Sequence, residues 1–177
     1  MNAGKQFGLK EGPATRDAFD KVLKEIGRHN TNLVVVDGDV SNSTRTEDFA
    51  KEFPERFFNV GIAESNLVGV ASGLAMAGKD VLAASFAAFL LCNAYDQIRM
   101  SVAFPQANVK LVGSHSGISI GEDGPSQMAI EDIALATSPP ISQCLCQLMR
   151  PPRGPQHARC WSRKVHFICA PDVQKSP

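Results

Sequence analysis

The sequence has no excess of charge of either sign and no long apolar run. Eighteen lysines and arginines balance eighteen aspartates and glutamates over 177 residues, so no basic face for nucleic acid is indicated. The longest apolar stretch, at residues 81–92, is interrupted by Ser85 and is too short to span a bilayer. Residues 1–12 lack the apolar core of a secretory signal. We therefore expect a soluble protein of the cytoplasm.

Cysteine, proline and tryptophan are scarce until the chain nears its end. One of five cysteines and four of eleven prolines lie before residue 138, and the single tryptophan follows it. The spacing of the four late cysteines matches no common zinc site, so no metal centre is predicted. The change in composition instead predicts an N-terminal extension at 1–12, a folded domain at 13–137 and an irregular tail at 138–177. The tail has too many prolines for a helix or a central strand.

Residues 13–137 alternate between strand and helix patterns. Short continuous apolar runs at 32–37, 56–60, 80–86 and 108–113 are typical of strands buried on both faces. Apolar residues at helical spacing predict helices at 14–26, 43–53, 64–77, 87–102 and 126–136. Strands separated by helices imply right-handed crossovers. The sequence therefore predicts an α/β fold, an open parallel sheet with helices on both faces.

Polar segments follow each of the four predicted strands: DGDVSNST, NVGIAES, SFAAF and GSHSGISIGEDGPSQ. The carboxyl ends of parallel strands share one edge of the sheet, where ligands bind in such folds, so we expect these segments to gather there. Each also has an ordinary structural interpretation. Glu64 could be an acidic first-turn residue favoured by the helix dipole, Phe86 and Phe89 could be core aromatics, and His115 could be a solvated loop residue.

The segments RFFNVGIAES, SFAAF, DQIRM and GSHSGISIGEDGPSQMAIEDIALA resemble transketolase, in its central, pyrimidine-binding domain. The resemblance runs from about residue 12 to residue 137, with several motifs in the family's order and spacing. Because it opens close to the N-terminus, the chain resembles the C-terminal subunit of a split transketolase. The resemblance implies the pyrimidine-domain fold that binds thiamine diphosphate, and transfer of a two-carbon ketol unit between phosphosugars.

The resemblance assigns three residues to the cofactor. In similar enzymes the glutamate at the position of Glu64 hydrogen-bonds the ring nitrogen of the thiamine aminopyrimidine. This bond promotes the imino tautomer that removes the thiazolium C2 proton, and the cofactor then acts as the electron sink. Phe86 and Phe89 match the aromatics that lie against the aminopyrimidine ring. Cys92 stands where some transketolases have a further aromatic.

Five residues match the family's substrate contacts. His115 corresponds to a histidine that faces the substrate hydroxyls, where it can handle protons near neutral pH. Asp123 resembles the carboxylate that bonds the sugar C2 hydroxyl, and Gln127 replaces a second histidine found in some members. Arg16 and Ser43 match phosphate contacts, although a solvent-facing helical arginine and an N-cap serine are the ordinary alternatives.

The chain lacks the G-D-G motif with a later Asn through which the family binds the diphosphate and its metal; the DGD at 37–39 ends a strand and supplies a turn. The resemblance therefore implies a partner, an N-terminal subunit whose diphosphate-binding domain holds Mg or Ca. It also implies self-association through a two-fold interface. Alternatives with the same fold are 1-deoxyxylulose-5-phosphate synthase and the 2-oxoacid dehydrogenase β subunit, but GEDGPSQ and DQIRM favour transketolase.

The tail allows a test with the genetic code alone. Where it begins, the family continues with a strand F-T-V-x-V-P-A-D-A, a helix and a strand G-P-V-Y-I-R. Read two nucleotides later, SPPISQCLCQLMR permits S-P-H-F-T-V-S-V-P-A-D-A, QHARCWSRK permits A-R-E-M-L-E-Q-E and KVHFICA permits S-P-F-Y-M-R. The pattern predicts a frameshifted tail, in which the last strands of the domain are lost, together with a further arginine that follows the last strand in the family. An inactive product without catalysis is the corresponding alternative.

Overall fold

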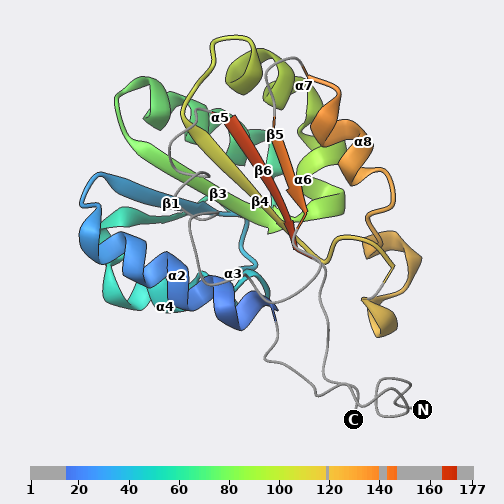
Figure 1. Ribbon diagram of the computed structural model, residues 1–177, viewed down its shortest axis with the longest axis horizontal. Helices are drawn as coiled ribbons and strands as arrows, with labels where there is room; N and C mark the ends of the chain where they lie inside the picture. Colours follow the sequence, from blue (N-terminus) through green and yellow to red (C-terminus); the bar gives the residue numbers. More distant parts are fainter. Residues whose placement is uncertain (1–14, 119, 140–142, 147–164, 171–177) are drawn as a thin grey trace.

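A twisted sheet of six parallel strands runs through the centre of the molecule, in the order β2-β1-β3-β4-β6-β5 (Figure 1). The computed structural model describes residues 15–118, 120–139, 143–146 and 165–170. The strands are β1 Leu33–Asp37, β2 Phe57–Asn59, β3 Asp80–Phe86, β4 Val109–Ser114, β5 Gln143–Cys146 and β6 Val165–Ala170. The predicted α/β fold is confirmed, and the four strands expected in residues 13–137 lie within two residues of their predicted bounds.

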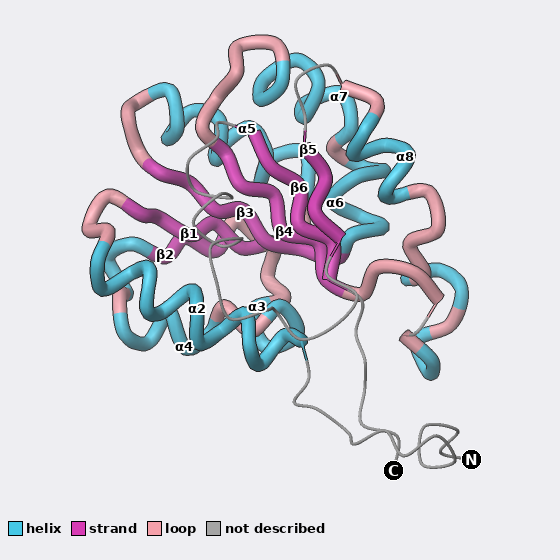
Figure 2. Tube along the Cα trace, in the orientation of Figure 1, coloured by secondary structure: helices cyan, strands magenta, loops and turns pink. Residues whose placement is uncertain are grey.

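Helices cover both faces of the sheet (Figure 2). Side chains alternate between the faces along each strand, so Val34 and Val36 of β1 enter one core cluster while Leu33 and Val35 enter the other. The first cluster packs against α5 Glu64–Met76, α6 Ala87–Asn93, the π-helical segment η2 Ile98–Ala103 and α8 Asp132–Thr137. The second packs against α2 Thr15–His29 and α4 Glu47–Glu52.

The single helix predicted at 43–53 is in fact two short ones. The helix α3 spans Ser41–Thr44, and Arg45 then adopts a left-handed conformation with φ of 62° before α4 begins. The break follows from Asp37, whose carboxylate accepts hydrogen bonds from the hydroxyls of Thr44 and Thr46. These bonds draw the chain back toward the end of β1, and a continuous helix would not allow them.

Two further helices are also interrupted. The segment predicted at 87–102 forms α6, then α7 Tyr95–Gln97 and η2. The segment predicted at 126–136 begins as a 3-10 turn, η4 Pro125–Gln127, and becomes α-helical only at α8. Between η4 and α8, Ala129 exchanges backbone hydrogen bonds with Gly117, at 2.8 and 3.1 Å. That pairing holds the segment extended, which is why the helix starts late.

The expectation that the last strands are lost and that the tail at 138–177 is irregular is wrong at 143–146 and 165–170, which form β5 and β6. Strand β6 lies between β4 and β5, pairing Val109–Ser114 with Val165–Ala170 residue for residue. The prolines counted against a strand all lie outside 143–146 and 165–170, and the segment VHFICA is an apolar run of ordinary strand length. The remaining positions of the tail from 140 onward, and the extension at 1–12, lie outside the described residues.

Among the described residues, no helix is both long enough and apolar enough to cross a membrane.

Candidate active site

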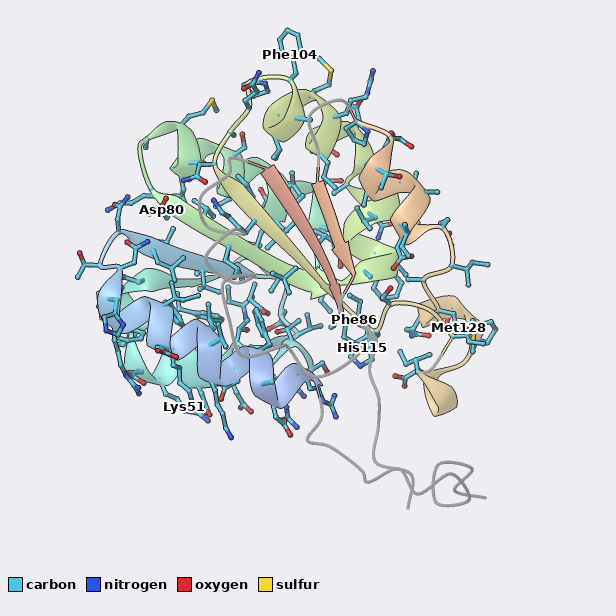
Figure 3. All side chains as sticks on the ribbon, in the orientation of Figure 1. Lys51, Asp80, Phe86, Phe104, His115 and Met128 are labelled. Atoms are coloured by element: carbon cyan, nitrogen blue, oxygen red, sulfur yellow. The ribbon has the colours of Figure 1, made fainter. Side chains whose placement is uncertain are left out.

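Two of the predicted site residues, Phe86 and His115, lie where strands β3 and β4 end. Figure 3 shows Phe86 and His115 side by side at the edge of the sheet toward which β3 and β4 point. Their positions follow from the register, because Phe86 ends β3 and pairs with Ser114, the last residue of β4. Phe104 lies at the opposite edge. The carboxyl edge of the sheet therefore carries both of these predicted site residues.

Glu64 is the first residue of α5 and is only 6% exposed. Its Oε1 accepts a hydrogen bond of 3.1 Å from the hydroxyl of Ser85, which is itself buried in β3. Among the residues that the structure describes, Oε2 accepts no hydrogen bond. That oxygen is therefore available to accept a hydrogen bond from a ligand. The arrangement fits the ring nitrogen of an aminopyrimidine.

Three rings line the edge next to Glu64. The rings of Phe86 and Phe89 are nearly parallel, with centroids 5.9 Å apart and an interplanar angle of 14°. The His115 ring lies 4.3 Å from that of Phe86, at 43°. Phe86 and Phe89 are half-buried, so each keeps part of its surface available. The pair offers a flat apolar surface suited to a heteroaromatic ring.

His115 is held in a strained backbone conformation, with φ of 58°. The side chain is buried and its Nδ1 lies 2.9 Å from the Oγ of Ser114. The hydroxyl of Ser114 in turn lies 3.5 Å from the backbone oxygen of Ser85. The histidine is therefore part of the sheet edge rather than a solvated loop residue, which removes the ordinary alternative.

Asp123 and Gln127 lie farther along the loop that follows β4. Asp123 is exposed at the end of η3 Gly121–Asp123, and Gln127 is half-buried in η4, where its side-chain oxygen accepts a hydrogen bond from Ser126. Neither bonds to Glu64. The structure thus places them on the same loop as His115 without joining them to the buried cluster.

An open pocket of about 460 Å³ adjoins Phe89. The thiol of Cys92 donates to Glu131 across 3.4 Å. Partial burial raises the pKa of that thiol, and the hydrogen bond to Glu131 raises it further, so Cys92 stays protonated and weakly nucleophilic. The pocket is lined by Ala88, Phe89, Cys92, Ile118, Pro125, Ser126, Met128, Ile130 and Glu131.

The two predicted phosphate contacts lie on neighbouring elements. Arg16 is in the first turn of α2, and Ser43 is in α3. The carboxylate of Asp17 lies 3.5 Å from the guanidinium of Arg45, which joins the start of α2 to the residue after α3. Both predicted residues are half-buried. The fold brings together two segments that are far apart in sequence.

Asp37 is a buried residue whose role the sequence did not reveal. Its carboxylate accepts bonds from the Val40 amide at 2.8 Å, the Thr44 hydroxyl at 3.0 Å and the Thr46 hydroxyl at 2.7 Å. Burial raises the pKa of Asp37, and these hydrogen bonds oppose that rise. Asp37 thus shapes the loop that carries Ser43. The available signal was the acidic residue that ends the apolar run LVVVD.

Residues 11–170 match the family model described as transketolase, pyrimidine binding domain. The chain belongs to this family. It is 51% identical over 125 residues to a putative transketolase C-terminal section from Methanocaldococcus jannaschii, a match that covers 71% of this chain and 40% of that protein. It is 48% identical to Homo sapiens transketolase over 73% of this chain and 20% of that protein.

Among solved structures, a split-gene transketolase described as an inactive beta4 tetramer superposes with a TM-score of 0.76 at 40% identity. That match covers 94% of this chain and 54% of the other. The transketolase-family chain therefore spans well under two thirds of the length of these relatives.

Proposed function

We propose that this transketolase-family chain is the pyrimidine-binding subunit of an enzyme that transfers a two-carbon ketol unit between phosphosugars. The observation that carries the proposal is the buried carboxyl of Glu64. One of its oxygens is bonded to Ser85, the other accepts no bond from the described residues, and a pair of stacked phenylalanines stands at the same sheet edge. These groups match the ring nitrogen and the flat face of the thiamine aminopyrimidine.

In this proposal the described side chains bind and orient the cofactor and substrate, and two of them, Glu64 and His115, take part in proton transfer. When bound, thiamine diphosphate would supply the nucleophilic carbon and the electron sink that ketose cleavage requires. The Glu64 carboxyl forms a hydrogen bond with the pyrimidine ring nitrogen and shares a proton with it. Phe86 and Phe89 hold the ring, and their apolar surface excludes water. His115 exchanges protons with the substrate hydroxyls.

The substrate contacts extend outward from this cluster. Asp123 and Gln127 bond the sugar hydroxyls from the loop after β4. Arg16 and Ser43 bind the terminal phosphate of the sugar, a role suited to a guanidinium and a hydroxyl on adjoining elements. The link between Asp17 and Arg45 supports this pairing of α2 with α3.

The proposed enzyme needs a second kind of subunit. The matched relatives include a transketolase C-terminal section and a split-gene enzyme whose beta4 tetramer is described as inactive. We propose that an N-terminal subunit binds the diphosphate of the cofactor through Mg or Ca, and that this chain also self-associates about a two-fold axis. The shared site would form only in the assembled complex.

Reconstitution tests the proposal. The chain alone should show no ketol transfer, and addition of the diphosphate-domain subunit, thiamine diphosphate and a divalent cation should restore it. Glu64→Gln should lower kcat in the complex by at least about a hundredfold, because a positioned proton-transfer group contributes about 10²–10⁴-fold. Near-normal turnover by this variant, with wild-type stability, would rule out the assignment of Glu64.

A further inference from the structure

Ser85 provides the only hydrogen bond to the Glu64 carboxyl within the described part of the chain. We infer that Ser85 is a positioning residue, which occupies Oε1 of Glu64 and thereby assigns Oε2 to the pyrimidine ring nitrogen. This inference rests on the proposed function and adds to it the residue that decides how Glu64 meets the cofactor.

The direction of the bond follows from the chemistry of the two groups. A hydroxyl can turn to donate its single proton, and the carboxyl oxygen that it reaches becomes an acceptor. With Oε1 so occupied, the proton that Glu64 shares with a ligand resides on the Oε2 side. Without Ser85, either oxygen could turn to the ring nitrogen, and the carboxyl would lose its fixed rotamer.

The local packing keeps the Ser85 hydroxyl in place. Ser85 is buried in β3, and Gly38 lies beside it after β1, held by a 3.1 Å hydrogen bond from its amide to the backbone oxygen of Ala84. A Cβ at Gly38 would stand 3.2 Å from the Ser85 Oγ and 3.4 Å from its Cβ. This is tighter than an ordinary contact, so the glycine leaves the space that the hydroxyl uses.

The same serine also adjoins the proposed proton-handling histidine. The backbone oxygen of Ser85 lies within 3.5 Å of the Ser114 hydroxyl, which contacts Nδ1 of His115 at 2.9 Å. Glu64 and His115 are therefore connected through two serines on paired strands: Ser85, the penultimate residue of β3, and Ser114, the last residue of β4. A shift of Ser85 would disturb both ends of this connection.

Binding measurements on the complex of the full chain with its partner subunit test the inference. Two ligands are titrated calorimetrically: thiamine diphosphate, and the analogue in which a CH group replaces the ring nitrogen proposed to bond Glu64. Ser85→Ala should weaken thiamine diphosphate binding about tenfold, the scale of one lost hydrogen bond. Binding of the CH analogue, which cannot bond Glu64, should be unchanged. Ser85→Thr retains the hydroxyl and should restore the wild-type preference.

Gly38→Ala provides a second variant that moves the hydroxyl without removing it. It should weaken binding of thiamine diphosphate by a smaller factor and spare the analogue. Gly73→Ala is the matched control, because a Cβ at Gly73 meets nothing within 4 Å. Equal weakening of both ligands by Ser85→Ala would show that Ser85 only supports packing, and would overturn the inference.

Glu64→Gln distinguishes a failure of the positioning role of Ser85 from a failure of the proposed role of Glu64. If this variant loses the preference for thiamine diphosphate over the analogue while Ser85→Ala retains it, the positioning role of Ser85 is wrong and Glu64 keeps its assignment. If Glu64→Gln retains the full preference, the proposed role of Glu64 itself fails, and the inference about Ser85 fails with it.

Discussion

The hydroxyl of Ser116 donates a hydrogen bond to the carboxylate of Asp132, and both side chains are buried. The bond ties the residue after His115 to the first turn of α8. Together with the backbone pairing of Gly117 and Ala129, it closes the loop that carries the proposed sugar contacts. The strained backbone of His115 thus has firm support on its C-terminal side.

Loss of this bond should destabilise the fold. Asp132→Ala would leave the Ser116 hydroxyl buried without its acceptor, at a cost of about 1–3 kcal/mol in the free energy of unfolding. Asp132→Asn keeps an acceptor oxygen and should cost less. Urea denaturation measures the difference, with Asp96→Ala, in an exposed ion pair with Arg99, as control. Equal midpoints for Asp132→Ala and the control would contradict the supporting role of this bond.

The buried Asp37 should make the free energy of unfolding depend on pH. Because burial raises its folded pKa above the ordinary 3.8, this group favours the folded state at acid pH and loses that contribution as pH rises through the folded pKa. Asp37→Asn cannot ionise, and its amide can donate to the hydroxyls of Thr44 and Thr46. The variant should therefore gain stability relative to wild type between mildly acid and neutral pH. Parallel pH profiles of unfolding free energy for the two proteins would refute this.

Substitution of Phe89 should affect cofactor affinity, whereas substitution of Phe49 should affect stability. Phe89 is half-buried beside the pocket, whereas Phe49 is a fully buried residue of α4 in the second core cluster. Phe89→Leu should weaken thiamine diphosphate binding to the complex by about 0.5–1.5 kcal/mol, the value of an aromatic stacking contact. Phe49→Leu should lower the melting temperature and leave cofactor affinity unchanged. A reversed pattern would show that Phe89 belongs to the core alone.

Arg16 should distinguish phosphorylated from unphosphorylated substrates. Removal of the guanidinium in Arg16→Ala should raise KM for a phosphosugar about tenfold or more, because a charge-assisted bond contributes about 1.5–3 kcal/mol. KM for an unphosphorylated ketose should stay the same. Arg28→Ala is the matched control, since Arg28 is exposed at the other end of α2 and pairs with Glu52. An equal rise of KM for both sugars would exclude a phosphate contact.

The strands of residues 33–114 were predictable because a strand buried on both faces has no polar side to interrupt its apolar run. The break between α3 and α4 was not, since it depends on hydrogen bonds from Thr44 and Thr46 to a residue of another element. Strand β6 was missed because prolines surround it in sequence, whereas its pairing with β4 is a long-range contact.

For the site, family motifs indicated Glu64, Phe86 and His115, but not the two serines that connect them. A serine near the end of an apolar strand carries little signal by itself. Ser85 and Ser114 come close only because the register of β3 with β4 pairs Phe86, the residue after Ser85, with Ser114. Hydrogen bonds between strands depend on that register, which no single segment of sequence contains.

We predict that the gene carries a frameshift before the codons of β5 and β6. Both strands lie in the sheet, and the family model extends to residue 170, so the segment keeps its place in the domain. The shifted reading replaces QCLC with part of F-T-V-S-V-P-A-D-A and VHFICA with P-F-Y-M-R. The threonine and valines favour strands, and the arginine would add a phosphate contact. A chain with the shifted tail should therefore resist urea better than this one and bind phosphosugars more tightly in the complex. Sequencing of the gene over these codons tests the origin of the tail, independently of the stability of the protein. An unshifted reading frame would contradict the prediction.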